Sequence, residues 1–377
     1  MNQPKEKKPR KSGIFQTTML LFNVIAAIIL LIVQIIPRFS PKTFWAFEPI
    51  AYTYPFLLII NIAFIIYWAI SRNRFAFISL FIIILGYDKL ELFYRPSFLV
   101  IEEPVTENSI QIMSYNVRLF DLYNWSGNKK TRNRIFDLLS KETPDITCFQ
   151  EYYHSDKPDF SNNDTLNKIL KSSYRQIEYG LTLYNDFHWG LATYSKYPII
   201  NKGLVFFKEG STNFGMFCDV IYKGDTIRVY NIHLQSNHFK KKDYEFISNP
   251  DSGSKEEIIK GAMSIFTHIK KGVLKRTEQV EILSAHIESC RYPTLVCGDF
   301  NDPPYSYAYN TISRNLKDCY TEKGKGFGIS YNGSFLPYRI DYILHSNYFE
   351  CLKYSMVRKK LSDHYPVIVT LKTHHKK

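Results

Sequence analysis

Two side chains that could do chemistry together stand near the C-terminus, in the stretch 294–304, which runs TLVCGDFNDPP. Asp299 and Asn301 follow an apolar run and precede a Pro-rich turn, a pattern typical of a strand that ends in a loop. Strand side chains alternate, so we predict that these two leave one face while Phe300 is buried opposite. A carboxylate beside a carboxamide could hold a hard cation, or fix a water or a phosphate oxygen. The alternative is a plain Asx-rich turn that caps the strand.

Other polar side chains stand beside short apolar runs in the same way: Asn116, Glu151, His233, Asp363 and His364. In α/β sheets the exposed ends of strands are where sites form, since the strand interiors are packed. Acids, two histidines and two carboxamides suit phosphoester hydrolysis. A divalent ion would neutralise phosphate charge, one group would orient the water, and another would stabilise the leaving oxygen.

The elements that must position these side chains begin near residue 109. Short β-rich runs alternate there with helical stretches, which predicts a layered α/β domain of roughly 265 residues. Predicted strands cover 110–115, 144–150, 190–195, 216–222, 226–231, 339–344 and 365–371. Helices are predicted over 131–141 and 254–290, the second with apolar residues at helical spacing and an interruption near Gly272.

The polar residues fall in a series of ordered motifs: Ser-Tyr-Asn116-Val, Phe-Gln-Glu151, Tyr-Ser-Lys-Tyr-Pro198, Asn-Ile-His233-Leu, Gly-Asp299-Phe-Asn301, Arg-Ile-Asp341-Tyr and Ser-Asp363-His364-Tyr-Pro. Any one of these is weak, but the ordered series resembles the endonuclease/exonuclease/phosphatase superfamily, which has the deoxyribonuclease I-like fold. The resemblance covers about residues 109–372. It implies a four-layer α/β sandwich and a phosphoric ester hydrolase that depends on Mg²⁺ or Mn²⁺.

The resemblance also implies a role for each motif residue. Glu151 would be the main metal ligand, with Asn116 and Asp363 completing or supporting the cation site. Asp299 would align or deprotonate the attacking water, and Asn301 would hold a phosphate oxygen.

Two histidines complete the catalytic set implied by the resemblance. His364 would contact the scissile phosphate, kept cationic by Asp341, because a nearby carboxylate raises a histidine pKa. His233 would contact phosphate or assist the leaving group, although its own motif supplies no carboxylate partner. Many apurinic endonucleases carry an acid where this chain has Arg118, so the sequence does not favour a second metal ion on that side.

The first hundred residues have a different composition. Residues 12–37 carry no charged side chain, and 17–36 is almost wholly apolar, which matches the ~20 residues that cross a bilayer. A second uncharged stretch, 49–71, is of spanning length. A third, 75–87, would be a span if it continued to about residue 94, or else a buried or interfacial helix. We therefore predict a tail over 1–16, two or three transmembrane helices within 17–95, and the catalytic domain over 106–373.

The first span should remain as an anchor, because its apolar run exceeds the ~7–15 residues of a signal peptide. Five basic residues precede it, and positive charge favours the cytoplasmic side, so we expect a multi-pass membrane protein whose N-terminal tail is cytoplasmic. Three spans would place the catalytic domain outside the cytoplasm, and two would leave it inside. The sequence favours the outside.

Charge and cysteine content narrow the function further. The formal net charge is +13, of which +7 lies in residues 1–100, so the globular part is only mildly basic and gives no strong indication of nucleic acid. The six cysteines form no CxxC pair and are predicted to be buried free thiols. The expected partners are the bilayer and a phosphoester, either nucleic acid or phospholipid, with no protein partner indicated. The alternatives are a phospholipid- or sphingomyelin-type phosphodiesterase rather than a nuclease, and a non-catalytic membrane scaffold.

Overall fold

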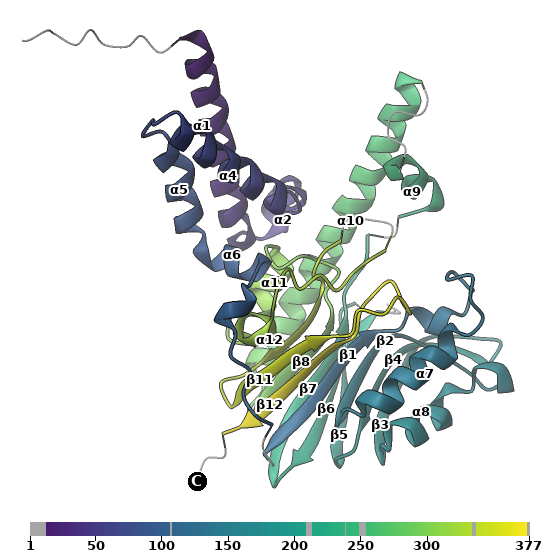
Figure 1. The fold of residues 1–377 in the computed structure, drawn as a ribbon. Helices are drawn as coiled ribbons and strands as arrows, with labels where there is room; N and C mark the ends of the chain where they lie inside the picture. Colours follow the sequence, from purple (N-terminus) through teal and green to yellow (C-terminus); the bar gives the residue numbers. More distant parts are fainter. Residues whose placement is uncertain are drawn as a thin grey trace, which may run out of the picture.

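The computed structural model describes residues 13–105, 108–208, 213–237, 239–248, 254–333 and 337–374, so the basic residues of the predicted tail lie outside the described part. A helical region comes first and a two-sheet domain follows (Figure 1). The main helices of the first region are α1 (Ile14–Ile35), α2 (Pro41–Phe44), α3 (Glu48–Ala51), α4 (Tyr54–Ile70), α5 (Ala76–Leu85) and α6 (Tyr87–Phe93).

The helical region matches the predicted membrane spans only in part. One helix, Ile14–Arg38, is long and apolar enough to cross a membrane, and it contains the predicted span 17–36. The second predicted span is instead a pair of segments, Pro41–Ala51 and Tyr54–Ile70, bent by 57°. Within the described residues there is thus one helix of spanning length, or two if the bent pair is one span. The structure does not support a third span.

Two local features explain the shorter helices. Pro55 begins α4, and proline favours the first turn of a helix, where its missing N–H costs nothing. Gly86 separates the ten residues of α5 from α6, so the third predicted span is broken at that position. A buried polar network joins α1, α4 and α5: Asn23 donates to Ser79 at 2.6 Å, and Ser79 donates to Asn61 at 2.8 Å.

Two six-stranded mixed sheets make up the rest of the chain. The first has the order β11 (Phe349–Met356), β12 (Val367–Thr373), β1 (Ser109–Asn116), β2 (Ile146–Ser155), β4 (Phe187–Ser195) and β3 (Tyr174–Leu183). The second has the order β5 (Ile199–Phe206), β6 (Phe214–Tyr222), β7 (Asp225–His233), β8 (Thr294–Asp299), β10 (Asp341–His345) and β9 (Lys317–Asp318). Parallel pairing joins β1 to β2 and β7 to β8.

The two sheets face each other across a shared core. Ile112 and Cys148 from the first sheet pack with Val229 and Cys297 from the second. Helices α7 (Thr131–Glu142) and α8 (Asn162–Leu170) cover the outer face of the first sheet, and α10 (Lys255–Glu288) and α11 (Tyr307–Ile312) cover that of the second. The predicted four-layer α/β sandwich is confirmed. Figure 1 shows the helical region and α10 rising from the same end of it.

Two sequence predictions about secondary structure are wrong. The helix expected to break near Gly272 continues through it, because α10 is one helix of 34 residues with a capping box at Ser254. The strand expected to end at Gln150 runs on to Ser155. All six cysteines are free, and five of them are buried, as predicted.

Candidate active site

Four of the predicted site residues point into the space between the two sheets. Side chains two apart on a strand share a face. Ile110 and Ile112 lie in the core between the sheets, so Asn116, at the end of the same strand, faces the same way. On β8, Asp299 likewise shares the face of the core residues Leu295 and Cys297. By the same alternation, His233 shares the face of Val229 on β7, and Asp341 shares the face of Ile343 on β10.

Strand pairing then places three of these residues side by side. Asp299 pairs with His233 on β7 and with Asp341 on β10. Directly paired residues on neighbouring strands have their Cβ atoms about 5 Å apart. Asp299 is therefore the centre of the group, and it is only 1% exposed.

Asn116 joins Asp299 to the metal ligand predicted from the sequence, Glu151. Its Nδ2 donates to Asp299 Oδ2 at 3.0 Å and to Glu151 Oε1 at 3.2 Å, while its Oδ1 accepts from the Arg118 backbone N–H at 3.0 Å. The Asn116 side chain is fully buried. It therefore holds two carboxylates beside one another from a third strand.

Glu151 reaches this position through an irregularity in β2. The register of β2 against β4 shifts between Phe149 and Tyr152, and Glu151 has a φ of 47°. Bulges of this kind turn a side chain away from the regular alternation. The sequence predicted Glu151 at the end of a strand, whereas the structure places it in a bulge within a longer one.

Asn301 follows the strand rather than belonging to it. β8 ends at Asp299, and Asn301 has a φ of 54°, so strand alternation does not orient it. Its backbone N–H donates to Asp299 Oδ1 at 2.8 Å, which is an Asx turn, and its Nδ2 donates to the Leu234 carbonyl at 2.9 Å. The turn offered as the alternative is present, and it is what sets Asn301 beside Asp299. Phe300 is fully buried, as predicted.

His364 and Asp341 form a close polar contact within the group. His364 Nδ1 lies 2.8 Å from Asp341 Oδ2, and its Nε2 faces Asp299 Oδ2 at 3.6 Å. Burial lowers the pKa of His364, but the Asp341 and Asp299 carboxylates outweigh burial and hold this pKa well above its usual value. Burial also raises the pKa of Asp299 to about 6, although the His364 and His233 charges oppose that rise.

His233 finds the carboxylates that its own sequence motif did not supply. Its Nε2 lies 3.7 Å from Asp299 Oδ2 and 3.8 Å from Glu151 Oε1. These distances exceed a hydrogen bond, so His233 is near both carboxylates without being tied to either. His188, on β4, contacts Asp156 and supplies no link to His233.

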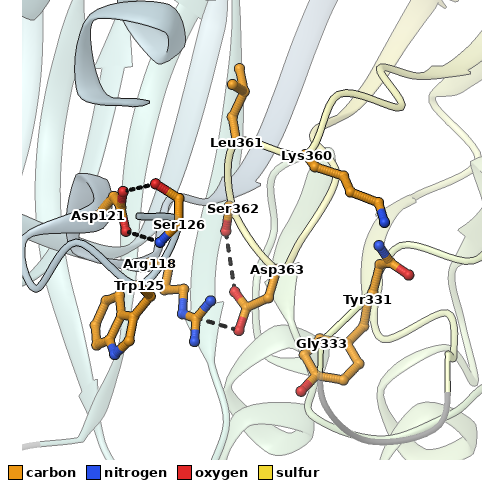
Figure 2. Close-up of a pocket in the computed structure, with 11 residues that line it drawn as sticks. Arg118, Asp121, Trp125, Ser126, Tyr331, Gly333, Lys360, Leu361, Ser362 and Asp363 are labelled. Atoms are coloured by element: carbon orange, nitrogen blue, oxygen red, sulfur yellow. Dashed lines mark hydrogen bonds and ion pairs between the residues drawn. The ribbon is translucent and has the colours of Figure 1, made fainter. Parts of the chain in front are cut away.

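Asp363 is paired with a basic side chain beside the other predicted ligands. Its carboxylate faces Arg118 Nε at 3.3 Å and Ser362 Oγ at 3.2 Å (Figure 2). Within the described residues, no hydrogen bond or ion pair joins Asp363 to Glu151. Ser362, which was not singled out in the sequence, holds this loop against the site by donating to the Asn116 carbonyl at 2.9 Å.

Two cavities flank the group. A cavity of about 820 Å³ opens beside Asp363 and is lined by Arg118, Trp125, Tyr331 and Lys360 among others (Figure 2). Another of about 650 Å³ is lined by Glu151, His233, Trp189 and Lys275 together with several leucines. Each cavity contains basic side chains, Arg118 and Lys360 in the first and Lys275 in the second. We name the group between them the candidate site: Asn116, Glu151, His233, Asp299, Asn301, Asp341, Asp363 and His364.

The candidate site has the composition of a divalent cation site. Ligand atoms of Asp299, Asp341 and His364 all lie within 4.8 Å of one another, but the two carboxylates hold His364 cationic, so this histidine is not available as a metal ligand. The Oδ1 atom of Asp341 is buried and has no hydrogen-bond partner among the described residues, so it could still accept a bond from a ligand. Glu151 is the acid whose side chain is most open, at 35% exposed. Oxygen donors with excess negative charge fit a hard ion such as Mg²⁺.

The sequence did not reveal two residues that contact the site residues and hold them in place. Ser330 is fully buried, and its hydroxyl accepts hydrogen bonds at 3.0 Å from the backbone N–H groups of Ile340 and Asp341. The ring of Tyr331 packs on His364 with centroids 5.1 Å apart. Neither residue lies in a polar strand-end motif, so the sequence held no signal for them. Arg339, two residues before Asp341, is paired with Asp318 at 2.6 Å.

Comparisons with known proteins agree with this architecture. The chain belongs to the endonuclease/exonuclease/phosphatase family, whose model matches residues 113–364. A domain of unknown function matches residues 16–93. No curated protein sequence matches the chain. The family and the site together indicate a phosphoester hydrolase.

Solved structures resemble the same part of the chain. Humanized TDP2 from D. rerio with 14 mutations is 17% identical, with a TM-score of 0.50, over 71% of this chain and all (100%) of that one. A family protein from Bacteroides thetaiotaomicron is 18% identical, with a TM-score of 0.50, over 72% of this chain and 100% of that one. At these identities the likeness shows the fold.

Proposed function

We propose that this protein is a membrane-attached, divalent-metal-dependent phosphodiesterase. The observation that carries the proposal is the convergence on Asp299 of side chains from separate segments: Asn116 at 3.0 Å, His364 at 3.6 Å and His233 at 3.7 Å. This carboxylate meets an amide and two imidazoles, which come from three separate segments of the chain. Groups arranged so around one carboxylate suit the transfer of a proton from water and the binding of an anion.

Glu151 is the principal metal ligand in this proposal, with Asn116 and Asp363 supporting the cation site. Bound there, Mg²⁺ or Mn²⁺ would neutralise phosphate charge. Glu151 has the most open side chain of these acids, and Asn116 holds it at 3.2 Å. Arg118 already balances part of the charge of Asp363, so Asp363 attracts the cation less strongly than Glu151 does.

The chain's own side chains perform the remaining steps. Asp299 orients the attacking water and accepts its proton. His364, held through Nδ1 by Asp341, presents Nε2 to a phosphate oxygen. Asn301 donates one amide hydrogen to Leu234 and keeps the other for phosphate, since a carboxamide carries two. His233 faces the phosphate or the leaving oxygen from the opposite side.

A diester fits the surroundings of the site better than a monoester. One cavity is lined by Asp363 and the other by Glu151 and His233, so each could take one substituent of the phosphate. Arg118 and Lys360 in one cavity and Lys275 in the other suit an anionic substrate.

The test uses the full chain in detergent micelles with bis(4-nitrophenyl) phosphate as the diester and 4-nitrophenyl phosphate as the monoester. We expect hydrolysis of the diester with Mg²⁺, its loss with EDTA, and a much lower rate on the monoester. Hydrolysis that survives EDTA would contradict the metal-dependent mechanism. A folded protein that binds Mg²⁺ but hydrolyses neither compound would favour the non-catalytic scaffold.

A phospholipid is the substrate class that the helical region favours. α1 is of spanning length, and the segment from Glu48 to Tyr54 contacts the loop that follows Asn301, so the site lies close to the membrane-associated part of the chain. Release of phosphorylated headgroup from vesicles, with plasmid nicking measured in parallel, separates the two classes. Nicking without headgroup release would establish a nuclease.

A further inference from the structure

The loop that leaves the candidate site is covered by the helical region. Tyr52, between α3 and α4, donates its hydroxyl hydrogen to Asp302, the residue that follows Asn301. Further along the same loop, the rings of Tyr54 and Tyr305 lie 4.6 Å apart. The Tyr307 backbone N–H donates to Glu48 at 2.7 Å. The segment 302–307 is therefore enclosed by residues that lie some 250 positions earlier in the chain.

A single arginine on α10 connects this loop to the other catalytic loop. Arg276 Nε and Nη2 donate to the two oxygens of Asp302 at 2.9 and 2.8 Å, a bidentate pair. Its Nη1 donates to the Gln235 carbonyl at 2.7 Å and to Asn237 Oδ1 at 3.1 Å. Gln235 and Asn237 follow His233, so Arg276 bonds both the loop after His233 and the loop after Asn301.

Tyr52 completes this arrangement. Arg276 Nη2 lies 3.3 Å from the Tyr52 hydroxyl, which itself bonds Asp302. Arg276 is 1% exposed and Asp302 is 2% exposed, so the pair is removed from water. We name Tyr52, Arg276 and Asp302 the docking node. Its three members come from the helical region, from α10 and from the catalytic loop.

The glycine in α10 permits the close approach. A Cβ at Gly272 would lie 2.4 Å from Asn237 Oδ1. Any larger residue would therefore push the loop after His233 away from Arg276, one turn further along the helix. Gly272, where the sequence predicted an interruption of the helix, is where the loop after His233 packs against α10.

We propose that Tyr52 is a positioning residue for the phosphoester reaction, and that the helical region thereby forms part of the catalytic unit. The proposal rests on the function proposed above. Asn301 is bonded to Asp299 through its backbone and to Leu234 through its side chain, so a shift of Asp302 reaches both loops of the site. Small displacements of positioned groups cost up to about 100-fold in rate.

The test compares two single-oxygen deletions at the same interface in the full chain. Tyr52→Phe removes the hydroxyl that bonds Asp302 and Arg276 and keeps the ring. Tyr338→Phe is the matched control, because its hydroxyl donates to the Tyr52 carbonyl at 2.6 Å and its ring packs on Tyr52 at 5.6 Å, without a hydrogen bond to Asp302. Tyr52→Phe should lower kcat by about tenfold with KM unchanged, and Tyr338→Phe should leave kcat within about twofold.

Hydrogen exchange provides a readout that does not depend on turnover. In Tyr52→Phe, peptides covering 234–237 and 300–307 should exchange faster than in the wild type, while in Tyr338→Phe they should not. Equal loss of kcat in both variants, or unchanged exchange in Tyr52→Phe, would overturn the positioning role. If the wild type hydrolyses no phosphodiester, the proposed function fails, and the exchange experiment still decides whether Tyr52 holds both loops.

Discussion

The candidate site and the docking node are both buried groups of charged side chains, and Asp302 of the node is three residues from Asp299 of the site. Their charges are balanced differently. In the node, both oxygens of Asp302 are bonded, to Arg276 and to Tyr52. In the site, Glu151, Asp299 and Asp341 bring three carboxylates together, and among the described residues Asp341 Oδ1 is buried without a hydrogen-bond partner.

This difference separates structural charge from functional charge. A buried ion pair with every oxygen bonded has no remaining demand for a ligand, and breaking it costs stability. A group with surplus carboxylates and a histidine held cationic still requires a cation and an anion to balance it, which is the usual condition of active sites. The predictions below use substitutions that should affect one group and spare the other.

The largest effect should follow from Asp299→Asn. This substitution removes the proposed general base, so turnover of the diester should fall by about 1,000-fold, within the range for general base catalysis. Stability should not fall, because the buried carboxylate that Asn replaces sits beside Asp341 and is disfavoured by burial. Steady-state kinetics and thermal unfolding of the same preparation measure both. A parallel loss of melting temperature would assign Asp299 to the structure instead.

A substitution in the docking node should mainly lower stability, whereas Asp299→Asn should mainly lower turnover. Arg276→Met leaves Asp302 buried and unpaired, which should lower the free energy of unfolding by about 3–5 kcal/mol. Arg118→Met is the control: it breaks a pair with Asp363 whose side chains are 35% and 19% exposed, and about 1 kcal/mol or less should be lost. Urea unfolding in micelles gives both values. Equal losses would remove the distinction between the two groups.

Metal affinity should respond to Glu151 more than to its neighbours. Glu151→Gln keeps the shape of the side chain and removes its charge, so the Mg²⁺ concentration for half-maximal turnover should rise by about tenfold or more, the order seen when a metal site loses a charged or supporting group. Arg118→Met frees the Asp363 carboxylate from its ion pair, so that concentration should fall or stay the same rather than rise. A calorimetric Mg²⁺ titration of both variants checks the result without turnover. Similar affinities for the two would reject Glu151 as the principal ligand.

The smallest effect should come from Gly272→Ala. Alanine favours the helix by up to about 1 kcal/mol, but its Cβ would meet Asn237, and overpacking costs about 1–3 kcal/mol. We expect a net loss of about 1 kcal/mol, measured by thermal unfolding. A gain in stability would mean that Asn237 moves freely and that the loop after His233 is not fixed by α10.

The parts of the site that could be predicted from sequence are those set by strand periodicity. Asn116, His233 and Asp299 follow from the alternation of apolar residues before them and Asp341 from the apolar residues after it, and the ordered motifs led to the family. Glu151 required a bulge, which leaves no periodic signal, and Asn301 required an Asx turn. The docking node could not be predicted at all, because Tyr52, Arg276 and Asp302 lie in unrelated local patterns. Gly272 was misinterpreted for the same reason, since its contact is tertiary.

The measurement that tests the central claim most directly is hydrolysis of bis(4-nitrophenyl) phosphate by the full chain in micelles while Mg²⁺ is removed with EDTA and then restored. Asp299→Asn should be measured in the same way. The account predicts that wild-type turnover disappears with the metal and returns with it, and that the variant stays about 1,000-fold below it throughout. Turnover that is indifferent to the metal, or that Asp299→Asn retains, would contradict the account.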